Sequence, residues 1–383
     1  MAGKEEMMND IETTYTHTYT TKFIIDRDPE FARMKEMGLE QYDRLFFVMD
    51  ENVERIYRDR IIEQSGASEK ETHILSVKPE EHSKSIDFYP VLVSFLEEHN
   101  AGRYDAVIAV GGGIIIDLVS FTVSTYMRGL PLFIIATTLI GQTDASTAGK
   151  TCLNSRNAKN LLGTFYYPLV VYNSIEILRT CSKRITRQGL SEAFKYSLLT
   201  DGKALDDIIY FCRHDFDSDV MERIVRKTIE SRIAVRKVDP LASNLGHTFG
   251  HALEKYSGFE VLHGDAILTG TVMAMTYGVE KGLMQEEEKE KIFAMMKEAG
   301  LNIYIPDDFE PEKLVNYMRR DKKSSSKKLH LVMISGIGRP YRGETPFWEA
   351  EYDEVQNFLE RYNQSYPYKK SNYAEYLRKE TLD

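Results

Sequence analysis

The chain has few cysteines and no long apolar run. Its 383 residues include only three cysteines, none of which stands in a CxxC pair, and three thiols cannot all pair internally. A disulfide-built scaffold is therefore excluded, and a reducing compartment, the cytoplasm, is expected. The longest apolar stretches, such as Ala106–Val110 and Leu132–Ala136, fall far below the ~20 residues of a membrane span. The polar, acidic start lacks the apolar region of a secretory signal, so we expect neither export nor membrane insertion.

Positive charge is also in deficit. The chain has 49 lysines and arginines against 59 aspartates and glutamates, which gives a net charge of −10. Such a charge repels nucleic-acid backbones and anionic membranes, so neither is an expected partner, although a local basic pocket is allowed. At ~100–200 residues per domain, the length predicts two or three domains.

The first half of the chain alternates strands with helices. After a polar tail over residues 1–18, short β-rich runs alternate with amphipathic stretches such as Ser85–His99, in which Pro90 disturbs the first turn. This alternation implies βαβ units, so residues 19–178 are expected to form an α/β, Rossmann-like domain on a parallel sheet. The expected strands are Leu45–Met49, Thr72–Val77, Ala106–Val110, Leu132–Ala136 and Leu169–Tyr172.

The second half, residues 179–383, reads as an all-α domain, which places a domain boundary near residue 178. One strand is expected at Leu329–Ile334. The tail from Phe347 has charged, tyrosine-rich and helix-like sequence and is expected to be a surface appendage without chemistry. The expected helices are Arg187–Leu199, Lys203–Cys212, Asp219–Val235, His247–Ser257, Ala266–Lys281 and Glu286–Ala299.

Three consecutive glycines, Gly111, Gly112 and Gly113, stand between an expected strand and an apolar helix. They let the backbone approach a bulky anion, and the following helix N-terminus can bind a pyrophosphate. Polar residues at the ends of two other strands, Thr137-Thr138 and Asp50-Glu51-Asn52, favour a nucleotide there. A tight strand-to-helix turn without a ligand is the alternative interpretation.

Histidines gather in the helical half. His247 and His251 stand four residues apart on one helical face, and His263 follows in the sequence LHGD. With Glu192 they offer one carboxylate and two imidazoles, a set typical of open catalytic Zn²⁺ sites. The pair lacks the glutamate of HExxH, which disfavours a water-activating metalloprotease. Histidines that cap helices or pack in the core are the alternative.

Cationic side chains stand in glycine-bearing stretches of this acidic chain, where they suit a phosphate. They are Arg128, Lys150, Lys159 and Lys195, with Asp144 nearby to orient a lysine or a cofactor group. Taken singly, each of them is also explained as an ordinary surface charge.

Six blocks in a specific order now make the sequence recognisable. The region from about Asp50 to Gly336 resembles the 3-dehydroquinate synthase superfamily, the sugar-phosphate cyclases. The resemblance implies an NAD-binding α/β domain, a helical metal- and substrate-binding domain, a Zn²⁺ or Co²⁺ ion, and a homodimer. The blocks are GGGIIIDLVSFTVSTYMRG, ATTLIGQTDASTAGKT, AKNLLGTFYYP, GLSEAFKY, NLGHTFGHALE and LHGDA.

The resemblance also implies a reaction. NAD⁺ oxidises a secondary alcohol of a sugar phosphate, phosphate leaves by β-elimination, and the ketone is reduced again. Ring opening and an intramolecular aldol closure then give a carbocycle. Oxidation must precede elimination because the unactivated C–H is too weak an acid for any side chain to deprotonate.

Site residues are carried over from the resemblance position by position. The metal ligands are Glu192, His247 and His263. The catalytic set is Lys150, Glu192, Lys195, Asn244 and His251. The substrate contacts are Asp144, Lys150, Asn160, Lys195, Asn244 and His251, with Arg128 reaching phosphate across the dimer and Lys322 or Lys323 as another phosphate ligand. The NAD contacts are Asp50, Asn52, Glu81, Lys84, Gly111, Gly112, Gly113, Asp117, Thr137, Thr138, Asp144, Lys159 and Thr180.

One departure bears on the substrate. Dehydroquinate synthases hold the substrate carboxylate with a lysine and, about fourteen residues later, an arginine. Here Arg232 replaces the lysine, and about six residues, the arginine among them, are missing around Pro240. Such an oriented charge pair is worth ~1.5–3 kcal/mol. Its loss favours a neutral-tailed substrate such as sedoheptulose 7-phosphate or glucose 6-phosphate. Arg232 alone could still bind a carboxylate, so 3-dehydroquinate synthase stays an alternative.

A different class of enzyme shares these features in part. An NAD-dependent metal polyol or alcohol dehydrogenase needs the glycine turn and the metal site, but not the phosphate set of Arg128, Lys150, Asn160 and Lys195. The presence of that set favours the cyclase. A non-catalytic scaffold is disfavoured by the intact metal ligands.

Overall fold

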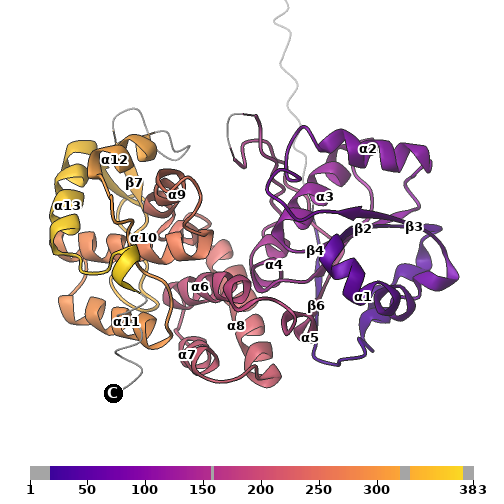
Figure 1. Cartoon of the computed structure of the whole chain (residues 1–383), viewed down its shortest axis with the longest axis horizontal. Coiled ribbons are helices and arrows are strands. Elements are labelled where there is room, and N and C mark those ends of the chain that lie inside the picture. The colour runs from indigo at the N-terminus through magenta and orange to yellow at the C-terminus, as the bar shows by residue number, and fades with distance from the viewer. Residues whose placement is uncertain (1–17, 157–158, 320–327, 374–383) are drawn as a thin grey trace, which may run out of the picture.

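The computed structural model describes residues 18–156, 159–319 and 328–373, which form two halves lying side by side (Figure 1). The first half is built on a six-stranded sheet in the order β1-β6-β5-β4-β2-β3. Every neighbouring pair in this sheet is parallel. The strands are β1 (Lys22–Asp26), β2 (Arg44–Asp50), β3 (Glu71–Val77), β4 (Ala106–Gly111), β5 (Leu132–Ala136) and β6 (Val170–Ser174).

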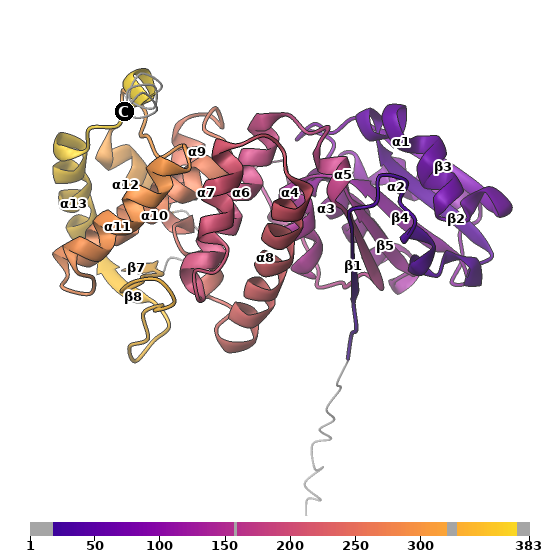
Figure 2. The ribbon, with the colours of Figure 1, turned by 90° about the horizontal axis from the view of Figure 1, so that it is seen from below.

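Helices cover both faces of this sheet, whose strands are seen from another side in Figure 2. In β4, Val107 and Ala109 face α2 and α3, whereas Ile108 and Val110 face the layer that contains α1 and α5. Strands buried on both faces read as continuous apolar runs, which is why the sequence predicts them. The helices are α1 (Glu51–Gln64), α2 (Tyr89–Glu98), α3 (Gly113–Thr125), α4 (Leu139–Thr143) and α5 (Ile175–Leu178), with short 3₁₀ turns at 34–37, 39–41, 67–69, 126–128 and 145–147.

The parallel sheet and the five expected strands are confirmed, as β2 to β6. The sequence analysis did not predict β1, a five-residue strand that follows the polar start of the chain and pairs with β6 at the sheet edge. The first turn of α2 contains Pro90, where a proline is tolerated because the N–H that it lacks has no partner within the helix.

The second half is mainly helical (Figure 1). Its long helix α10 is buried along most of its length, and α6, α9 and α11 pack against it. The helices are α6 (Lys183–Leu199), α7 (Leu205–Arg213), α8 (Ser218–Val238), α9 (His247–Tyr256), α10 (His263–Glu280), α11 (Glu286–Glu298), α12 (Pro311–Arg319) and α13 (Tyr352–Ser365), with a 3₁₀ turn at 242–244 and a hairpin of β7 (Lys328–Leu331) and β8 (Trp348–Glu351).

Two of these helices begin earlier than expected. α6 starts at Lys183 because the hydroxyl of Ser182 caps it by accepting a hydrogen bond from Ile185 N–H. α10 starts at His263 after the extended residue Leu262. The sequence analysis did not predict α12.

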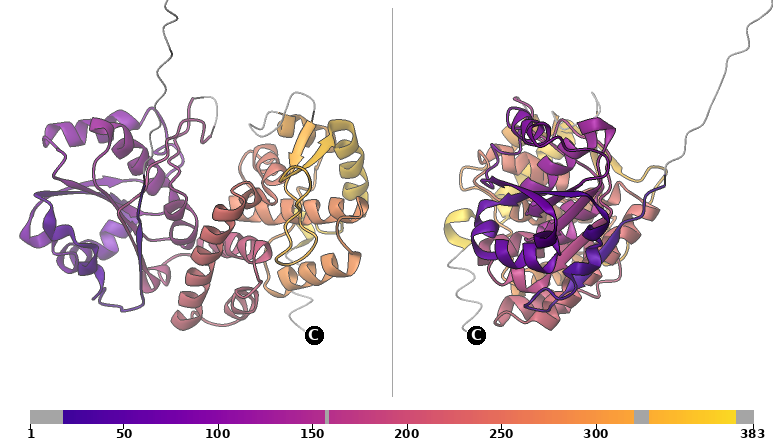
Figure 3. Two further views of the ribbon diagram at one scale, coloured as in Figure 1. Left: turned by 180° about the vertical axis from the view of Figure 1, so that it is seen from behind. Right: turned by 90° about the vertical axis from the view of Figure 1, so that its right-hand side faces the viewer.

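The expectation of a surface appendage after Phe347 is wrong. β8 pairs with β7, and α13 buries Val355, Phe358, Leu359 and Tyr362 in the core of the helical half. These four residues follow the i, i+3, i+4, i+7 spacing of one helical face. Figure 3 shows α13 and the hairpin at the end of the molecule far from the sheet.

The two halves meet where α4 packs against α6 and α8. The last strand of the sheet ends at Ser174, and the first long helix of the other half begins at Lys183. Among the described residues, no helix is both long enough and apolar enough to cross a membrane.

Candidate active site

The order in which the chain adds strands to the sheet reverses between β2 and β4. From β2 the chain passes through α1 to β3 on one side, and from β4 it passes through α3 to β5 on the other. Open parallel sheets bind ligands at such a point, outside the carboxyl ends of their strands. Asp50 ends β2 and Gly111 ends β4, and a Cβ on Gly111 would lie 3.3 Å from the Cβ of Asp50.

The turn between β4 and α3 leaves no room for a side chain at Gly111 and little room at Gly112. A Cβ on Gly111 would lie 2.7 Å from the Ile115 side chain, and one on Gly112 would lie 3.0 Å from Thr138. α3 begins at Gly113 without a capping side chain, so amide N–H groups of its first turn can bind an anion. The backbone therefore suits a pyrophosphate.

Two of the expected NAD contacts also cap helices. The Asp50 carboxylate accepts a 2.8 Å hydrogen bond from Asn52 N–H at the start of α1, and burial raises the pKa of Asp50. The Thr138 hydroxyl accepts a 3.1 Å bond from Gly141 N–H at the start of α4. Both side chains therefore stabilise a helix N-terminus, in addition to the NAD contacts expected of them.

Others of the expected NAD contacts lie in pairs. Lys84 and Asp117 form a 2.5 Å ion pair, with only 11% and 14% of their side chains exposed. Glu81 lies 3.4 Å from the Lys159 ammonium, which also sits 3.9 Å from the ring centroid of Phe259 in the helical half. These contacts join the segment after β3 to α3 and to Lys159.

Thr137 and Thr180 complete the expected NAD positions. Thr137 is buried, and its carbonyl accepts a 3.2 Å hydrogen bond from the Cys181 thiol. The Thr180 hydroxyl accepts a 3.3 Å bond from Tyr57 on α1. The segment after α5 therefore lies against the end of β5.

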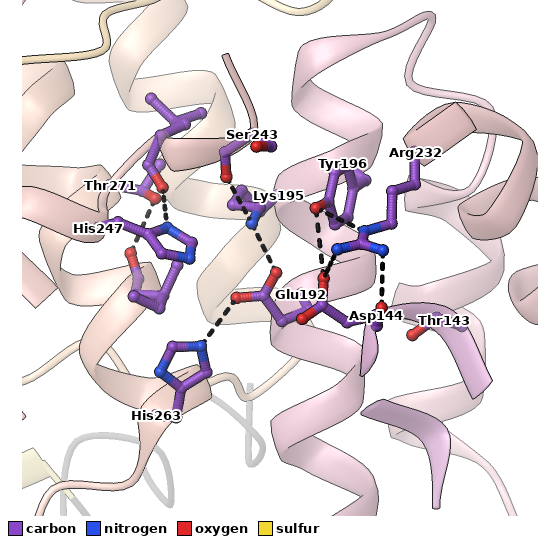
Figure 4. Close-up of polar contacts among 12 residues, drawn as sticks. Thr143, Asp144, Glu192, Lys195, Tyr196, Arg232, Ser243, His247, His263 and Thr271 are labelled. Carbon is purple, nitrogen blue, oxygen red and sulfur yellow. Dashed lines mark hydrogen bonds and ion pairs between the residues drawn. The ribbon is translucent and has the colours of Figure 1, made fainter. Parts of the chain in front are cut away.

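Three helices bring the candidate metal ligands together (Figure 4). Glu192 lies on α6, and His247 and His263 are the first residues of α9 and α10. One ligand atom from each lies within 4.8 Å of the other two. The imidazole Nε2 of His263 is 3.5 Å from Glu192 Oε1. One carboxylate oxygen and two imidazole nitrogens at this spacing fit a divalent ion such as Zn²⁺.

Glu192 is the most enclosed of these ligands. Its side chain and that of Lys195 are each 1% exposed, and Lys195 Nζ lies 2.6 Å from Glu192 Oε2. Burial opposes the carboxylate, but the Lys195 ammonium together with His263 and His247 outweighs it and holds the pKa of Glu192 well below its usual range. The Glu192 carboxylate oxygen Oε1 has no hydrogen-bond partner among the described residues. A buried anionic oxygen of this kind suits a cation.

The imidazole of His263 has a raised pKa. Burial opposes its charged form, but the neighbouring carboxylates of Glu192 and Glu254 outweigh this effect and raise the pKa of His263 to about 10. The Nδ1 of His247 lies 3.1 Å from the Leu245 carbonyl, which orients that ring. The ring of His251 lies on the same side of α9, with its centroid 5.1 Å from that of His247.

Arg232 binds groups of the protein itself. Its Nη2 lies 2.8 Å from Asp144 Oδ1, its Nη1 donates a 2.6 Å hydrogen bond to the Asp144 carbonyl, and its Nε donates a 2.9 Å bond to the Tyr196 hydroxyl (Figure 4). Nη1 also contacts the Thr147 hydroxyl. A guanidinium has five N–H groups, so little of this one is left for a ligand.

The charges of Arg232 and Asp144 act on the nearby ammonium of Lys150. Burial lowers the pKa of Lys150, and the positive charges of Arg232 and Arg236 lower it further, while Asp144 acts in the opposite direction. Burial lowers the pKa of Lys195, but the negative charge of Glu192 outweighs burial with smaller help from Tyr196 and Asp144, so the pKa is raised. Asp144 therefore interacts with both lysines of the expected catalytic set.

The remaining expected substrate residues lie in turns and loops. Arg128 is exposed in the 3₁₀ turn at 126–128 with a positive φ of 68°, and Asn160 also has a positive φ, 51°. Asn244 ends the 3₁₀ turn that precedes α9. Lys322 and Lys323 lie outside the described residues.

Two residues at this site were absent from the sequence prediction. Tyr196 joins Arg232 to Asp144, with its hydroxyl 3.3 Å from Asp144 Oδ1. Glu254 lies 3.3 Å from His263 Nδ1. Its place in the sequence, seven residues after His247 and three after His251, puts it on the face of α9 that carries both histidines, and this spacing could have revealed it.

Solved structures share this fold. The chain superposes on 2-deoxy-scyllo-inosose synthase complexed with carbaglucose-6-phosphate, NAD⁺ and Co²⁺ with a TM-score of 0.81 at 22% identity, covering 88% of this chain and 96% of that one. For 2-epi-5-epi-valiolone synthase from Streptomyces hygroscopicus with NAD⁺ and Zn²⁺, the TM-score is 0.79 at 20% identity, covering 92% and 99%. An NADH-dependent butanol dehydrogenase from Thermotoga maritima gives 0.66 at 14% identity, covering 91% of this chain and 98% of the dehydrogenase.

Sequence comparisons identify the family. The chain is 32% identical over 304 residues to the 3-dehydroquinate synthase of Aliivibrio fischeri, covering 77% of this chain and 84% of the relative. The enzyme of Thermoanaerobacter pseudethanolicus is 32% identical over 309 residues, covering 77% and 85%. Family models for the N-terminal and C-terminal parts of 3-dehydroquinate synthase match residues 74–188 and 189–324. The chain therefore belongs to the 3-dehydroquinate synthase family, as the six sequence blocks predict.

Proposed function

We propose that this protein is an NAD- and metal-dependent sugar-phosphate cyclase, a carbon–oxygen lyase that eliminates phosphate and closes a carbocycle. One observation carries the proposal: Glu192, His247 and His263 converge in the helical half of a chain whose other half ends β4 in a glycine turn at the switch point of its sheet. The family membership and the two cyclases of the same fold support it.

The residues present suit both cofactors. Glu192, His247 and His263 would hold a divalent metal, Zn²⁺ or Co²⁺, because they offer one buried carboxylate oxygen and two imidazole nitrogens. The glycine turn and the N-terminus of α3 would hold the NAD pyrophosphate. When bound, NAD⁺ provides the hydride acceptor, and the metal provides a Lewis acid beside the substrate oxygens.

The protein's own side chains would orient the sugar phosphate. Lys195 is held by Glu192 and by the Ser243 carbonyl, which accepts a 2.9 Å hydrogen bond from it. Lys150 has a lowered pKa, so it can exchange a proton closer to neutral pH than an ordinary lysine. Phosphate would be bound by Arg128, by Asn160 and by Lys322 or Lys323, and the sugar by Asp144, Asn244 and His251.

The contacts of Arg232 support a neutral-tailed substrate. Its guanidinium is paired with Asp144 and Tyr196, and its side chain is only 13% exposed. A substrate carboxylate would have to compete with this internal ion pair. We therefore propose a sugar phosphate such as sedoheptulose 7-phosphate or glucose 6-phosphate, with a cyclitol as product. The curated relatives favour the alternative, 3-dehydroquinate synthase.

Phosphate release distinguishes a cyclase of neutral sugar phosphates from a 3-dehydroquinate synthase. The purified protein would be given NAD⁺ and Zn²⁺ or Co²⁺, with sedoheptulose 7-phosphate, glucose 6-phosphate and the shikimate heptulosonate 7-phosphate offered in parallel. We expect release from a neutral sugar phosphate without accumulation of NADH. Release from the heptulosonate alone would make the protein a 3-dehydroquinate synthase. Stoichiometric NADH without phosphate release would make it a polyol or alcohol dehydrogenase.

We further propose a domain boundary, an oligomeric state and a cellular compartment for this enzyme. The chain would divide near residue 178, which is supported by two hydrophobic clusters confined to residues 24–177. A homodimer would let Arg128 reach the phosphate in the partner subunit. No disulfide joins Cys152, Cys181 and Cys212, all of which the structure describes, and this supports a cytoplasmic enzyme.

A further inference from the structure

His263 lies between two carboxylates that approach different nitrogens of its ring. Its Nε2 is 3.5 Å from Glu192 Oε1, and its Nδ1 is 3.3 Å from Glu254 Oε2. Glu254 is on α9, the helix that begins with His247, and its side chain is 16% exposed. The same imidazole therefore contacts one residue of the candidate metal cluster and one residue outside it.

The chemistry of imidazole decides what Glu254 can do. A neutral ring has one N–H donor and one lone pair, and an ionised carboxylate only accepts hydrogen bonds. If Nδ1 carries the hydrogen and donates it to Glu254, the lone pair of Nε2 is directed towards Glu192. That side of the ring is where His247 also contributes a ligand atom.

A second arrangement competes with this one. His251, Glu254 and His263 also bring ligand atoms within 4.8 Å of one another. Two observations favour the cluster with Glu192: its Oε1 is buried without a hydrogen-bond partner among the described residues, whereas Glu254 already accepts a hydrogen bond from His263. In the favoured arrangement Glu254 faces the ring of a ligand and does not bind the ion.

We propose that Glu254 is a positioning residue for the metal site: it fixes His263 in the Nδ1–H tautomer and aims Nε2 at the ion held with Glu192 and His247. Hydrogen-bond partners of this kind orient metal-bound histidines and strengthen their binding. The inference rests on the proposed metal site.

The test measures metal affinity, which does not depend on turnover. Zn²⁺ binding to the full-length protein would be followed by competition with a chromophoric chelator for the wild type and for Glu254→Gln. We expect one ion per chain in both and an affinity about 10–100-fold lower in Glu254→Gln. Glu254→Asp, which keeps the carboxylate but shortens its reach, should fall between them.

A matched control separates this effect from a general loss of charge. Glu260 follows α9, its side chain is 71% exposed, and it pairs with Lys370. Glu260→Gln removes the same charge from the same region, so we expect wild-type Zn²⁺ affinity. Circular dichroism melts would show whether each variant is folded, and if Glu254→Gln is not, Glu254→Asp carries the test.

Three outcomes would overturn the proposal or its basis. Unchanged affinity in a folded Glu254→Gln would show that Glu254 does not position His263. A complete loss of Zn²⁺ in Glu254→Gln and in His251→Ala, with binding retained in His247→Ala, would make Glu254 a ligand of the second cluster. No Zn²⁺ binding by the wild type would contradict the proposed metal site itself, whatever Glu254 does.

Discussion

The guanidinium of Arg232, a residue that the sequence resemblance predicts to replace a lysine of dehydroquinate synthases, contacts groups of the protein itself. Three of its nitrogens reach the Asp144 carboxylate, the Asp144 carbonyl and the Tyr196 hydroxyl. An arginine serves here better than a lysine because its planar fork can satisfy several acceptors at once. The positive charge of Arg232 is thereby held by groups of the protein, and it also acts on Lys150.

The effect on Lys150 can be measured with Arg232→Met. Burial is the largest cause of the lowered Lys150 pKa, and the charge of Arg232 is the next. Removing a nearby positive charge favours the ammonium form, so we expect the Lys150 pKa to rise while it stays below the ordinary lysine value, because burial is unchanged. Side-chain NMR titration of labelled lysine would follow this pKa directly.

A control on the same helix makes the comparison specific. Arg226 is on α8, where it pairs with Glu222 at a side-chain exposure of 51%. Arg226→Met should leave the Lys150 pKa where it is in the wild type. A Lys150 pKa that falls or stays fixed in Arg232→Met would contradict the proposed electrostatic link.

Metal binding should also stabilise the folded protein, and this effect should require His247 as a ligand. A ligand that binds only the folded state adds about 2.7 kcal/mol to the free energy of unfolding at a concentration of 100 Kd. We expect Zn²⁺ at that excess to raise the Tm of the wild type and a chelator to reverse the rise. His247→Ala should fold but show no Zn²⁺-dependent shift. An equal shift in His247→Ala would show that His247 is not a ligand.

At the scale of elements, the C-terminal helix α13 supports the helices that carry the histidines. The ring of Phe358 lies 5.1 Å from that of Tyr277 on α10 and 6.3 Å from that of Phe249 on α9. Phe249 stands between His247 and His251 on α9, so the packing of α13 bears on the position of the candidate metal ligands.

Phe358→Ala should therefore be strongly destabilising. Phe358 is fully buried, and truncating such a ring removes both its burial and its packing, at a cost of about 3–5 kcal/mol in the free energy of unfolding. Urea denaturation would measure this loss. Asn357→Ala, at the adjacent exposed position of α13, should change the stability by less than about 0.5 kcal/mol. Equal stability of the two variants would show that α13 does not belong to the core.

The buried strands of the sheet were predictable from the sequence, whereas the short edge strand and the position of the C-terminal helix were not. The strands β2 to β6 are continuous apolar runs because both sheet faces are covered. β1 has only five residues and alternates in burial at the sheet edge, so it carries little signal. α13 was expected to be helix-like, but its charged and tyrosine-rich sequence wrongly suggested a surface position.

At the scale of the whole molecule, the site depends on contacts between distant parts of the chain. Asp144 and Arg232 are 88 residues apart in sequence, and α4 must pack against α8 before they can meet. The sequence blocks predicted that Glu192, His247 and His263 gather, because the chain resembles a known family. Spacing alone could not predict that Arg232 would bind Asp144, since that pairing follows from tertiary packing.

The proposed homodimer makes a prediction about the complete assembly. Arg128 is exposed and lies in a turn with left-handed backbone conformation, so its side chain is free of the core and can meet another molecule. If Arg128 completes the site of the partner subunit, Arg128→Ala and Glu192→Ala should each abolish activity alone, since each removes one part of every site.

Mixing these two variants tests the arrangement. A hybrid dimer has one intact site, formed by the Glu192 of one subunit and the Arg128 of the other, and one site that lacks both residues. With random exchange of subunits, half of the dimers are hybrids, so about a quarter of the wild-type phosphate release should return. Exchange would be verified by mass spectrometry of differently tagged chains. If hybrids form and no activity returns, Arg128 serves its own subunit or lies outside the site.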